Sequence, residues 1–249
     1  MSNLVIIPTY NEKENIEALI PIISSLEIGF DILVVDDNSP DGTALAVKQL
    51  QQKFPNVYLI ERQGKMGLGS AYLAGFEWAL QRDYDYIFEM DADFSHNPHD
   101  LIKLYRACHE EGADLAIGSR YISGVNVVNW PLSRVLMSYF ASIYVRIITG
   151  MKIKDTTAGF KCYKRKVLEN ILAYKINSVG YCFQIEMKFI AWKLGYKIVE
   201  IPIIFTERKT GSSKMSGGIF NEAFWGVLRM KFRSFFIKYK RLPDEDNIK

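Results

Sequence analysis

The sequence has few of the residues that build disulfide frameworks and metal–thiolate centres. Its 249 residues include three cysteines, Cys108, Cys162 and Cys182, which cannot all pair and have no metal-ligand spacing. The three histidines show no metal-ligand pattern either. These shortages exclude a disulfide-stapled secreted domain and indicate a reducing compartment.

Long apolar runs and targeting signals are missing as well. The apolar stretch at residues 132–148 is interrupted by Arg134 and Arg146, and it falls short of the roughly 20 apolar residues that a membrane span needs. The N-terminus enters an apolar segment without a basic region or a cleavage site, so we expect no signal peptide. The glycines of GKMGLGSA (64–71) do not match GxGxxG with a later acid, which excludes that kind of dinucleotide site.

What the sequence does have is an ordinary globular composition, 49% hydrophobic and 24% charged, with enough chain for a sizeable core. Its formal net charge of +3 is unevenly distributed. Residues 219–241 hold six basic residues and one acid, whereas residues 242–249 hold three acids and one lysine. The rest of the chain is neutral overall, so the basic segment needs its own explanation.

The first 120 residues alternate between strand-like and helix-like segments. We expect strands at residues 4–7, 31–36, 57–60, 86–90 and 114–117. We expect helices at 11–26 with Asn11 as the N-cap, from after Gly42 to about 53, at 70–81 and at 98–111. This order predicts an α/β fold, with a mostly parallel sheet flanked by helices on both faces.

The second half is less regular. We expect a helix at 132–148, a short strand near 160–163, helices near 165–172 and 182–194, and a strand near 197–205. The last element is an amphipathic helix at about 219–239, with apolar residues at spacings of three and four and basic residues on much of its other face. Such a helix suits a membrane interface, although a helix packed on the domain fits the same pattern.

Two aspartates one residue apart follow the expected strand at 86–90. In an open α/β sheet, ligands bind beyond the carboxyl ends of the strands, where this chain repeatedly places polar residues. Asp91 and Asp93 point the same way in extended backbone, and a divalent cation relieves their repulsion. An oxygen-only site suits Mg²⁺ or Mn²⁺, which in turn binds a diphosphate. A lone D-x-D also fits a pair of turn and N-cap aspartates.

Seven sequence blocks extend this interpretation. They are VIIPTYNE (5–12), ILVVDDNSPDGT (32–43), GLGSAYLAGF (67–76), MDADFSHNP (90–98), GSRY (118–121), DTTAGFKCY (155–163) and FTERKTGSSKM (205–215). Their order resembles that of dolichyl-phosphate mannose synthases, which are inverting family 2 glycosyltransferases with the Rossmann-like GT-A fold. The resemblance implies a nucleotide-sugar donor, with GDP-mannose as the first expectation, and a polyprenyl or dolichyl phosphate acceptor.

The resemblance also implies roles for individual residues. Those matching the nucleoside site are Pro8, Tyr10, Glu12, Val35 and Asp37. Those matching the metal and diphosphate site are Asp91, Ala92 and Asp93, with Arg208 and Lys214 in a loop that closes over the diphosphate. Some relatives have glutamine where this chain has Ser95. Serine is shorter, so a bridging water is an alternative to direct metal ligation there.

On the acceptor side, the resemblance implies that Arg120, Arg134 and Ser138 bind the acceptor phosphate and that Asp155 positions acceptor or sugar. By sequence alone, Arg134 also fits a solvated helix charge and Asp155 a turn residue. A phosphate monoester has a second pKa near ~6, so it is nucleophilic at neutral pH without a strong general base. Catalysis then consists of orienting two anions and stabilising the departing nucleoside diphosphate, to which the metal and Arg120 contribute.

We therefore expect a glycosyltransferase domain at residues 1–215, a basic amphipathic helix at 216–241 and an acidic tail at 242–249. A lipid-linked acceptor favours placing the helix at a membrane interface. The expected location is the cytoplasmic face of a membrane, with peripheral attachment and no nucleic-acid partner.

Three alternatives stay open. A polyprenyl-phosphate glucosyltransferase would run the same reaction with UDP-glucose. A sugar-nucleotide pyrophosphorylase needs a glycine-rich basic loop after the first strand, where this chain has PTYNE. A nucleotide-sugar sensor that is not an enzyme has no need of Arg120, Arg134 and Ser138.

Overall fold

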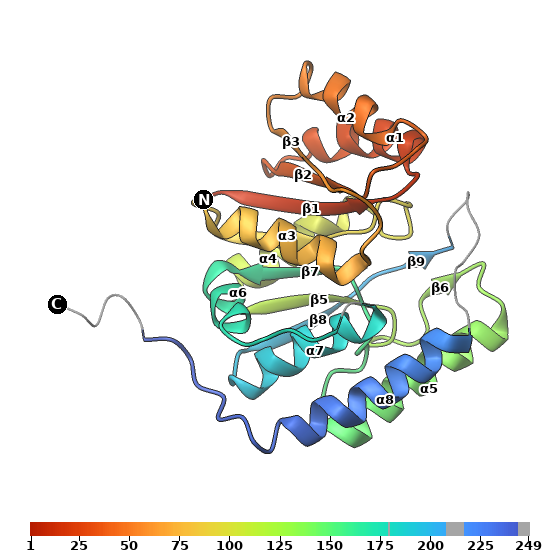
Figure 1. The fold of residues 1–249 in the computed structure, drawn as a ribbon, viewed down its shortest axis with the longest axis vertical. Helices are drawn as coiled ribbons and strands as arrows, with labels where there is room; N and C mark the ends of the chain where they lie inside the picture. Colours follow the sequence, from red (N-terminus) through yellow and green to blue (C-terminus); the bar gives the residue numbers. More distant parts are fainter. Residues whose placement is uncertain (179, 208–216, 244–249) are drawn as a thin grey trace.

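The computed structural model describes residues 1–178, 180–207 and 217–243 (Figure 1). Its main sheet has the strand order β3-β2-β1-β4-β7-β5-β8. The strands are β1 (Asn3–Thr9), β2 (Asp31–Asp36), β3 (Val57–Glu61), β4 (Tyr86–Glu89), β5 (Leu115–Ser119), β7 (Lys161–Lys164) and β8 (Ile198–Pro202). Neighbours are parallel except at β7, which is antiparallel to both β4 and β5. The predicted mostly parallel α/β sheet is confirmed.

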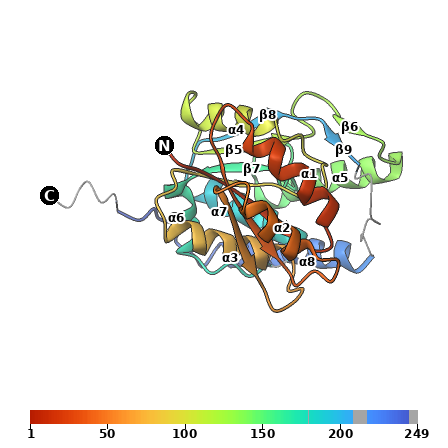
Figure 2. The same cartoon turned by 90° about the horizontal axis from the view of Figure 1, so that it is seen from above.

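Helices cover both faces of this sheet, as the view from above shows (Figure 2). The helices of the described residues are α1 (Lys13–Ser24), α2 (Thr43–Gln51), α3 (Leu68–Leu80), α4 (Asp100–His109), α5 (Leu132–Thr149), α6 (Arg165–Leu172), α7 (Tyr181–Lys193) and α8 (Gly217–Arg233), and all but α5 and α8 pack on the sheet. Because side chains alternate along a strand, Val5 and Ile7 share a core with α1, α2 and α4, whereas Leu4 and Ile6 share one with α3, α6 and α7.

The close packing of α3 on β1 depends on Gly75, in the GLGSAYLAGF block. A Cβ at this position would lie 2.6 Å from Ile6 Cγ2. Any larger residue would therefore push α3 away from the sheet, because the core has no free space to absorb it.

The second half of the chain places α5 and α8 side by side, outside the layers of the main sheet (Figure 1). α8 also packs on α7 and buries Val227 and Met230. A separate small sheet pairs β6 (Val127–Val128) with β9 (Phe205–Thr206). The chain thus carries a helical appendage on its α/β body.

Three local expectations were wrong. The N-cap of α1 is Glu12, because Asn11 adopts a left-handed φ of 61°. α8 ends at Arg233 instead of residue 239, since the Ser234 hydroxyl donates to the Lys231 carbonyl (2.7 Å) and competes with the helical bond. The single strand expected at 197–205 is two strands in different sheets, because β8 ends at a proline, which has no N–H to continue the ladder.

Candidate active site

Four strand ends of the main sheet meet along one edge. β1, β2 and β4 are mutually parallel, and β5 shares their direction because β7 is antiparallel to both β4 and β5. Tyr10, Asp37, Asp91 and Arg120 follow these four strands, so they lie along the same edge. The sheet thus brings together the strand ends that the sequence singled out.

The backbone turns sharply after three of these strands. Asn11, Asn38 and Phe94 have positive φ values of 61°, 57° and 58°. Asparagine tolerates this left-handed conformation, whereas phenylalanine is strained in it. Such strain concentrates at functional sites. Next to Phe94, the Ser95 N–H donates to Asp93 Oδ1 at 3.1 Å, which closes the turn after β4.

Asp37 is the centre of the residues that the resemblance assigns to the nucleoside. Its Oδ1 pairs with Arg62 Nη1 at 2.9 Å, and its Oδ2 accepts the Met66 N–H at 3.3 Å. Burial raises the pKa of Asp37, although the charges of Arg62 and Lys65 oppose the shift. Lys65 Nζ also lies 4.5 Å from the centroid of the Tyr10 ring. The loops after β1, β2 and β3 therefore converge on one cluster.

The other residues assigned to the nucleoside offer less polar surface. Glu12 is half-buried, and its Oε2 accepts the Asn15 side-chain N–H at 2.6 Å. Val35 is fully buried in the core, so only its backbone faces this edge. Pro8 pairs with Val35 in the sheet and is half-buried. Pro8 and Val35 can therefore shape the site but contribute no polar side chain to it.

The predicted metal residues lie in the turn after β4. The Asp91 side chain is 35% exposed, and the Tyr72 hydroxyl lies 3.5 Å from its Oδ1. Ala92 is buried, which leaves only its backbone for a ligand. Ser95 is 2% exposed, and its Oγ has no hydrogen-bond partner among the described residues. A buried hydroxyl without a partner is costly, so a water or ligand beside Ser95 would stabilise this turn.

These oxygen donors fit Mg²⁺ or Mn²⁺ better than a transition metal that prefers nitrogen or sulfur. Within residues 1–178, 180–207 and 217–243, no three histidine, cysteine or acidic side chains gather where they could hold a metal ion. The protein would therefore supply few ligands, and a substrate diphosphate and water would complete the shell, as is usual for Mg²⁺.

His96 supports the same turn from its buried side. Its buried ring stacks on Phe160 with centroids 4.8 Å apart, and its Nδ1 accepts the Asp91 N–H at 3.4 Å. Burial lowers the pKa of His96 to about 4. The imidazole is therefore neutral at neutral pH, and Nδ1 stays available as an acceptor.

A fully buried ion pair fixes the end of β4 beneath the aspartates. Glu89 Oε1 lies 2.9 Å from Lys161 Nζ and accepts the Tyr163 hydroxyl at 2.7 Å. Glu89 Oε2 accepts the Gln184 side-chain N–H at 2.7 Å. Burial lowers the pKa of Lys161, and the Glu89 charge opposes that shift. A buried pair satisfied in this way holds β4, β7 and α7 in one arrangement.

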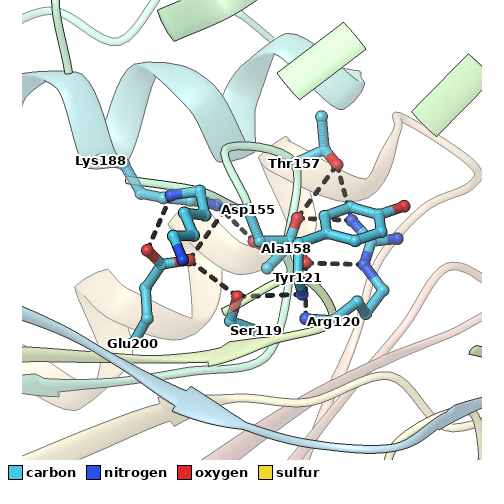
Figure 3. A network of polar contacts seen from close by, with 9 residues as sticks. Ser119, Arg120, Tyr121, Asp155, Thr157, Ala158, Lys188 and Glu200 are labelled. Carbon is cyan, nitrogen blue, oxygen red and sulfur yellow. Dashed lines mark hydrogen bonds and ion pairs between the residues drawn. The ribbon is translucent and has the colours of Figure 1, made fainter. Parts of the chain in front are cut away.

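Arg120 is held by a buried carboxylate (Figure 3). Its Nε and Nη2 donate to Asp155 Oδ2 and Oδ1 at 2.7 and 2.6 Å, and its backbone N–H donates to Oδ2 at 2.9 Å. Its Nη2 also donates to Thr157 Oγ1 at 2.7 Å. Burial raises the pKa of Asp155, but the Arg120 charge and hydrogen bonds outweigh burial and lower it overall. Asp155 is therefore a buried residue that orients the Arg120 guanidinium, and its proposed role toward acceptor or sugar stays a prediction.

Glu200, on β8, fastens the two segments that carry this pair (Figure 3). Its Oε1 accepts the Ser119 hydroxyl and the Asp155 N–H, both at 2.8 Å, and its Oε2 accepts the Lys154 N–H at 2.7 Å. Ser119 directly precedes Arg120 at the end of β5. One carboxylate thus locks the strand end to the loop that brings in Asp155.

Lys188, on α7, also binds the loop that contains Asp155. This fully buried side chain of α7 donates to the carbonyl of Ala158, three residues after Asp155. Burial, reinforced by the charge of Lys161, lowers the pKa of Lys188 well below its usual range. The loop is therefore fixed both from the sheet and from a helix.

The residues assigned to the acceptor phosphate gather around Trp130. The guanidinium carbons of Arg134 and Arg120 lie 4.1 and 5.6 Å from a Trp130 ring centroid. Ser138 follows Arg134 by one turn of α5 and lies beside Tyr121. The structure therefore brings Arg120, Arg134 and Ser138 to one corner.

Aromatic rings connect this corner to the aspartate turn. The ring of His96 lies 5.3 Å from that of Phe205, which lies 5.2 Å from that of Trp130. Glu207, two residues after Phe205, accepts a hydrogen bond from Arg134 Nη1 at 2.8 Å. A row of contacting rings thus connects the turn after β4 to the corner that holds Arg120 and Arg134.

Arg208 and Lys214 lie outside the described residues, so their roles stay predictions. Sequence analysis missed several residues that the structure adds to the site. Arg62 directly follows β3, and the strand-end rule applied to β3 would have found it. Glu200 and Trp130 have no local signal, because their roles arise from contacts with distant segments.

Known proteins resemble the chain over most of its length. The model for glycosyl transferase family 2 matches residues 4–172. A polyprenol monophosphomannose synthase from Mycolicibacterium smegmatis is 48% identical over 230 residues, covering 90% of this chain and 86% of that protein. An undecaprenyl-phosphate mannosyltransferase from Micrococcus luteus is 46% identical over 229 residues, covering 92% of this chain and 93% of that protein.

Solved structures share the fold at low sequence identity. Glucosyl-3-phosphoglycerate synthase from Mycobacterium tuberculosis, with Mn²⁺, UDP and glucosyl-3-phosphoglycerate, matches with a TM-score of 0.70 at 16% identity, covering 98% of this chain and 81% of that one. The same enzyme with Mg²⁺ and UDP has a TM-score of 0.68 at 17% identity, with the same coverage. Together with the family match, these comparisons show that the chain is a GT-A-like glycosyltransferase and belongs to glycosyl transferase family 2.

Proposed function

We propose that this protein transfers mannose from GDP-mannose to a polyprenyl phosphate, with inversion at the anomeric carbon. The observation that carries the proposal is the row of contacting rings of His96, Phe205 and Trp130, through which the Asp91–Asp93 turn lies close to the Arg120–Arg134 corner. A transferase acting on two phosphorylated substrates needs two such charged regions within reach of each other. The names of the two relatives at 48% and 46% identity support mannose and a polyprenyl phosphate.

On the donor side, Tyr10 offers a ring face to the nucleoside, and Asp37 offers a carboxylate oriented by Arg62. Asp91, Asp93 and Ser95 would hold Mg²⁺ or Mn²⁺ next to the diphosphate. A bound divalent cation of this kind neutralises the developing charge of the leaving diphosphate. The glucosyl-3-phosphoglycerate synthase structures contain Mn²⁺ or Mg²⁺, which supports this choice by analogy.

On the acceptor side, Arg120, Arg134 and Ser138 orient the acceptor phosphate. A phosphate oxygen forms the new bond to the anomeric carbon while the bond from that carbon to the diphosphate oxygen breaks. The acceptor is largely dianionic above its second pKa near ~6, so no residue needs to remove a proton. Arg208 and Lys214 are proposed to add positive charge at the leaving group.

The lipid acceptor requires contact with a membrane, and α5 and α8 offer a surface for it. No helix in the described ranges has the length and apolarity to cross a bilayer. Among the described side chains on and just after these helices, the exposed large apolar ones are Leu132, Leu136, Met137, Tyr139, Phe140, Ile147, Phe224, Trp225, Phe232, Phe235 and Phe236. These exposed side chains favour the membrane interpretation over simple packing. We propose peripheral attachment to an anionic membrane, on its cytoplasmic face.

The test is transfer with defined substrates. The purified protein is incubated with a divalent cation, a polyprenyl phosphate and radiolabelled GDP-mannose or UDP-glucose, and the lipid product is identified by mass spectrometry. We expect mannosyl phosphoryl polyprenol from GDP-mannose alone. A glucosylated lipid would replace the proposed donor with UDP-glucose, and binding of nucleotide sugar with no transfer to any lipid phosphate would overturn the proposed reaction.

A further inference from the structure

A cavity of about 390 Å³ lies between α7, α8 and the chain segments at residues 174–178 and 237–239. Its volume falls within the range of small-molecule sites. None of the described residues that line it belongs to the site described above. The cavity is therefore a separate feature of the helical appendage and needs its own explanation.

The floor of this cavity is apolar. Cys182, Phe189 and Ile190 of α7 and Met230 of α8 line it, and all four are buried. The ring of Tyr239 closes one side, with its centroid 6.3 Å from that of Phe189. A floor of this kind favours a hydrocarbon chain over a polar metabolite.

The rim of the cavity is basic. Arg229 and Arg233 are one turn apart on the same face of α8, and both line the cavity together with Lys175. Glu186 also lines it, but its Oε2 already accepts the N–H groups of Asn177 (3.1 Å) and Ser178 (2.9 Å). The rim therefore attracts an anion, and two arginines suit a phosphate in particular.

The mouth of the cavity adjoins the exposed apolar surface of α8. Trp225 lines the cavity, is 64% exposed and lies one turn before Arg229. Phe232 follows Arg229 by three residues and is also 64% exposed. A ligand can therefore keep one part in the cavity and another part along this apolar surface.

We propose that this cavity binds a single anionic phospholipid, with its phosphate at Arg229 and Arg233 and part of one acyl chain on the floor of Cys182, Phe189, Ile190 and Met230. The inference rests on the proposed membrane attachment of α5 and α8, and it does not depend on which sugar the enzyme transfers. It differs from general attraction to an anionic surface, because a single lipid would bind at defined residues with defined stoichiometry.

The experiment is native mass spectrometry of the delipidated full chain, titrated with short-chain phosphatidylglycerol. We expect one bound lipid. The variant Arg229→Gln/Arg233→Gln should weaken binding at least about tenfold, since it removes two charge-assisted contacts. The matched control Lys238→Gln/Lys240→Gln removes the same charge from exposed residues outside the cavity lining, and it should change binding by less than about twofold if the site is local.

Two further titrations test whether binding needs an anionic headgroup and whether it needs the acyl chains. Phosphatidylcholine of the same chain length should bind more weakly, and inorganic phosphate at the same concentration should not compete. Equal losses in the two double variants, equal binding of both lipids, or competition by inorganic phosphate would each overturn the lipid site. No step measures sugar transfer, so a failure of the proposed reaction leaves this result intact.

Discussion

The two ends of the site differ in how their charges are held. On the acceptor side, Asp155 is fully buried and grips Arg120 through both oxygens, and Glu200 locks the surrounding backbone. On the proposed donor side, the Asp91 side chain is about one-third exposed, and the Tyr72 hydroxyl lies 3.5 Å from its Oδ1. The Arg120–Asp155 pair is thus pre-assembled by the protein itself, whereas Asp91, in the proposed metal turn, is open to a ligand. Asp37, also on the proposed donor side, resembles Asp155 in being buried against an arginine.

This difference distinguishes carboxylates that stabilise the fold from carboxylates that are available to bind a ligand. A buried carboxylate that is satisfied within the protein cannot bind a metal without first losing its partner. A partly exposed carboxylate at a strained turn, such as Asp91, can bind a metal without such a loss. The comparison predicts that substitution of Asp155 reduces stability and activity together, whereas substitution of Asp93, in the turn after β4, reduces activity alone.

Asp155→Asn should have the largest effect on stability. It leaves the buried Arg120 guanidinium without its anionic partner, and breaking such a pair costs about 3–5 kcal/mol. Urea unfolding at pH 7 measures this change. The control is Glu61→Gln, which breaks the half-exposed Lys48 pair (2.7 Å) and should cost less than about 1 kcal/mol. Equal losses for the two variants would contradict the proposed difference between buried and exposed pairs.

The same variant carries a pH signature. The pKa of Asp155 is lowered in the folded protein from its ordinary 3.8, so its stabilisation is complete above that value and is lost as pH falls through the folded pKa. The stability gap between the wild type and Asp155→Asn should therefore be widest above pH 4 and narrow below it. A gap that stays constant from pH 7 to pH 3 would show that Asp155 acts by shape alone.

Asp93→Asn should cut turnover by about a hundredfold or more, because weakening the metal site removes several kcal/mol of transition-state stabilisation. Unfolding free energy should stay unchanged, and added Mn²⁺ should no longer raise the melting temperature. Asp83→Asn, an exposed carboxylate just before β4 at the other end of the strand, is the matched control. If Asp93→Asn turned over as fast as the wild type in excess chelator, the proposed role of a metal would be wrong.

Glu200→Gln should have an intermediate effect. The amide replaces one of the oxygens that accept from Ser119, Lys154 and Asp155, so about 1.5 kcal/mol of stability is lost. Because Glu200 positions the Arg120 pair, the KM for the acceptor should rise while the KM for the donor stays the same. Ser119→Ala removes the Ser119 hydroxyl's bond to Glu200 and the longer bond that it accepts from the Tyr121 N–H (3.3 Å), but it leaves the two backbone contacts of Glu200 in place and should do less. A parallel rise of both KM values would indicate a general loss of structure.

Glu207→Gln should have the smallest effect. Its ion pair with Arg134 is partly exposed, and such pairs contribute about 0–1 kcal/mol. Glu207 also competes with an acceptor phosphate for the same guanidinium, so the acceptor KM should fall slightly or stay constant. A clear rise in the acceptor KM would instead make Glu207 part of the machinery that orients Arg134.

The residues of the candidate site could be predicted from the sequence where they directly follow a strand. Asp37, Asp91 and Arg120 could be placed from the alternation of strands and helices, because residues after parallel strands share one edge. The ends of α8 and of the strand at 197–205 were misjudged, since a serine side chain and a proline outweighed the apolar pattern. The reversed direction of β7 was not predicted, because a short strand with four residues carries no signal of its direction.

The sequence by itself determined the elements, their order and the polar residues at the strand ends, because these depend on propensities and turn residues that act over a few neighbouring positions. Only the tertiary structure decided the partners. Arg120 meets Asp155 across 35 residues, and Ser119 meets Glu200 across 81. These contacts exist because β7 enters between β4 and β5 and places β8 at the edge. Strand order is a global property of packing, so no local pattern contains it.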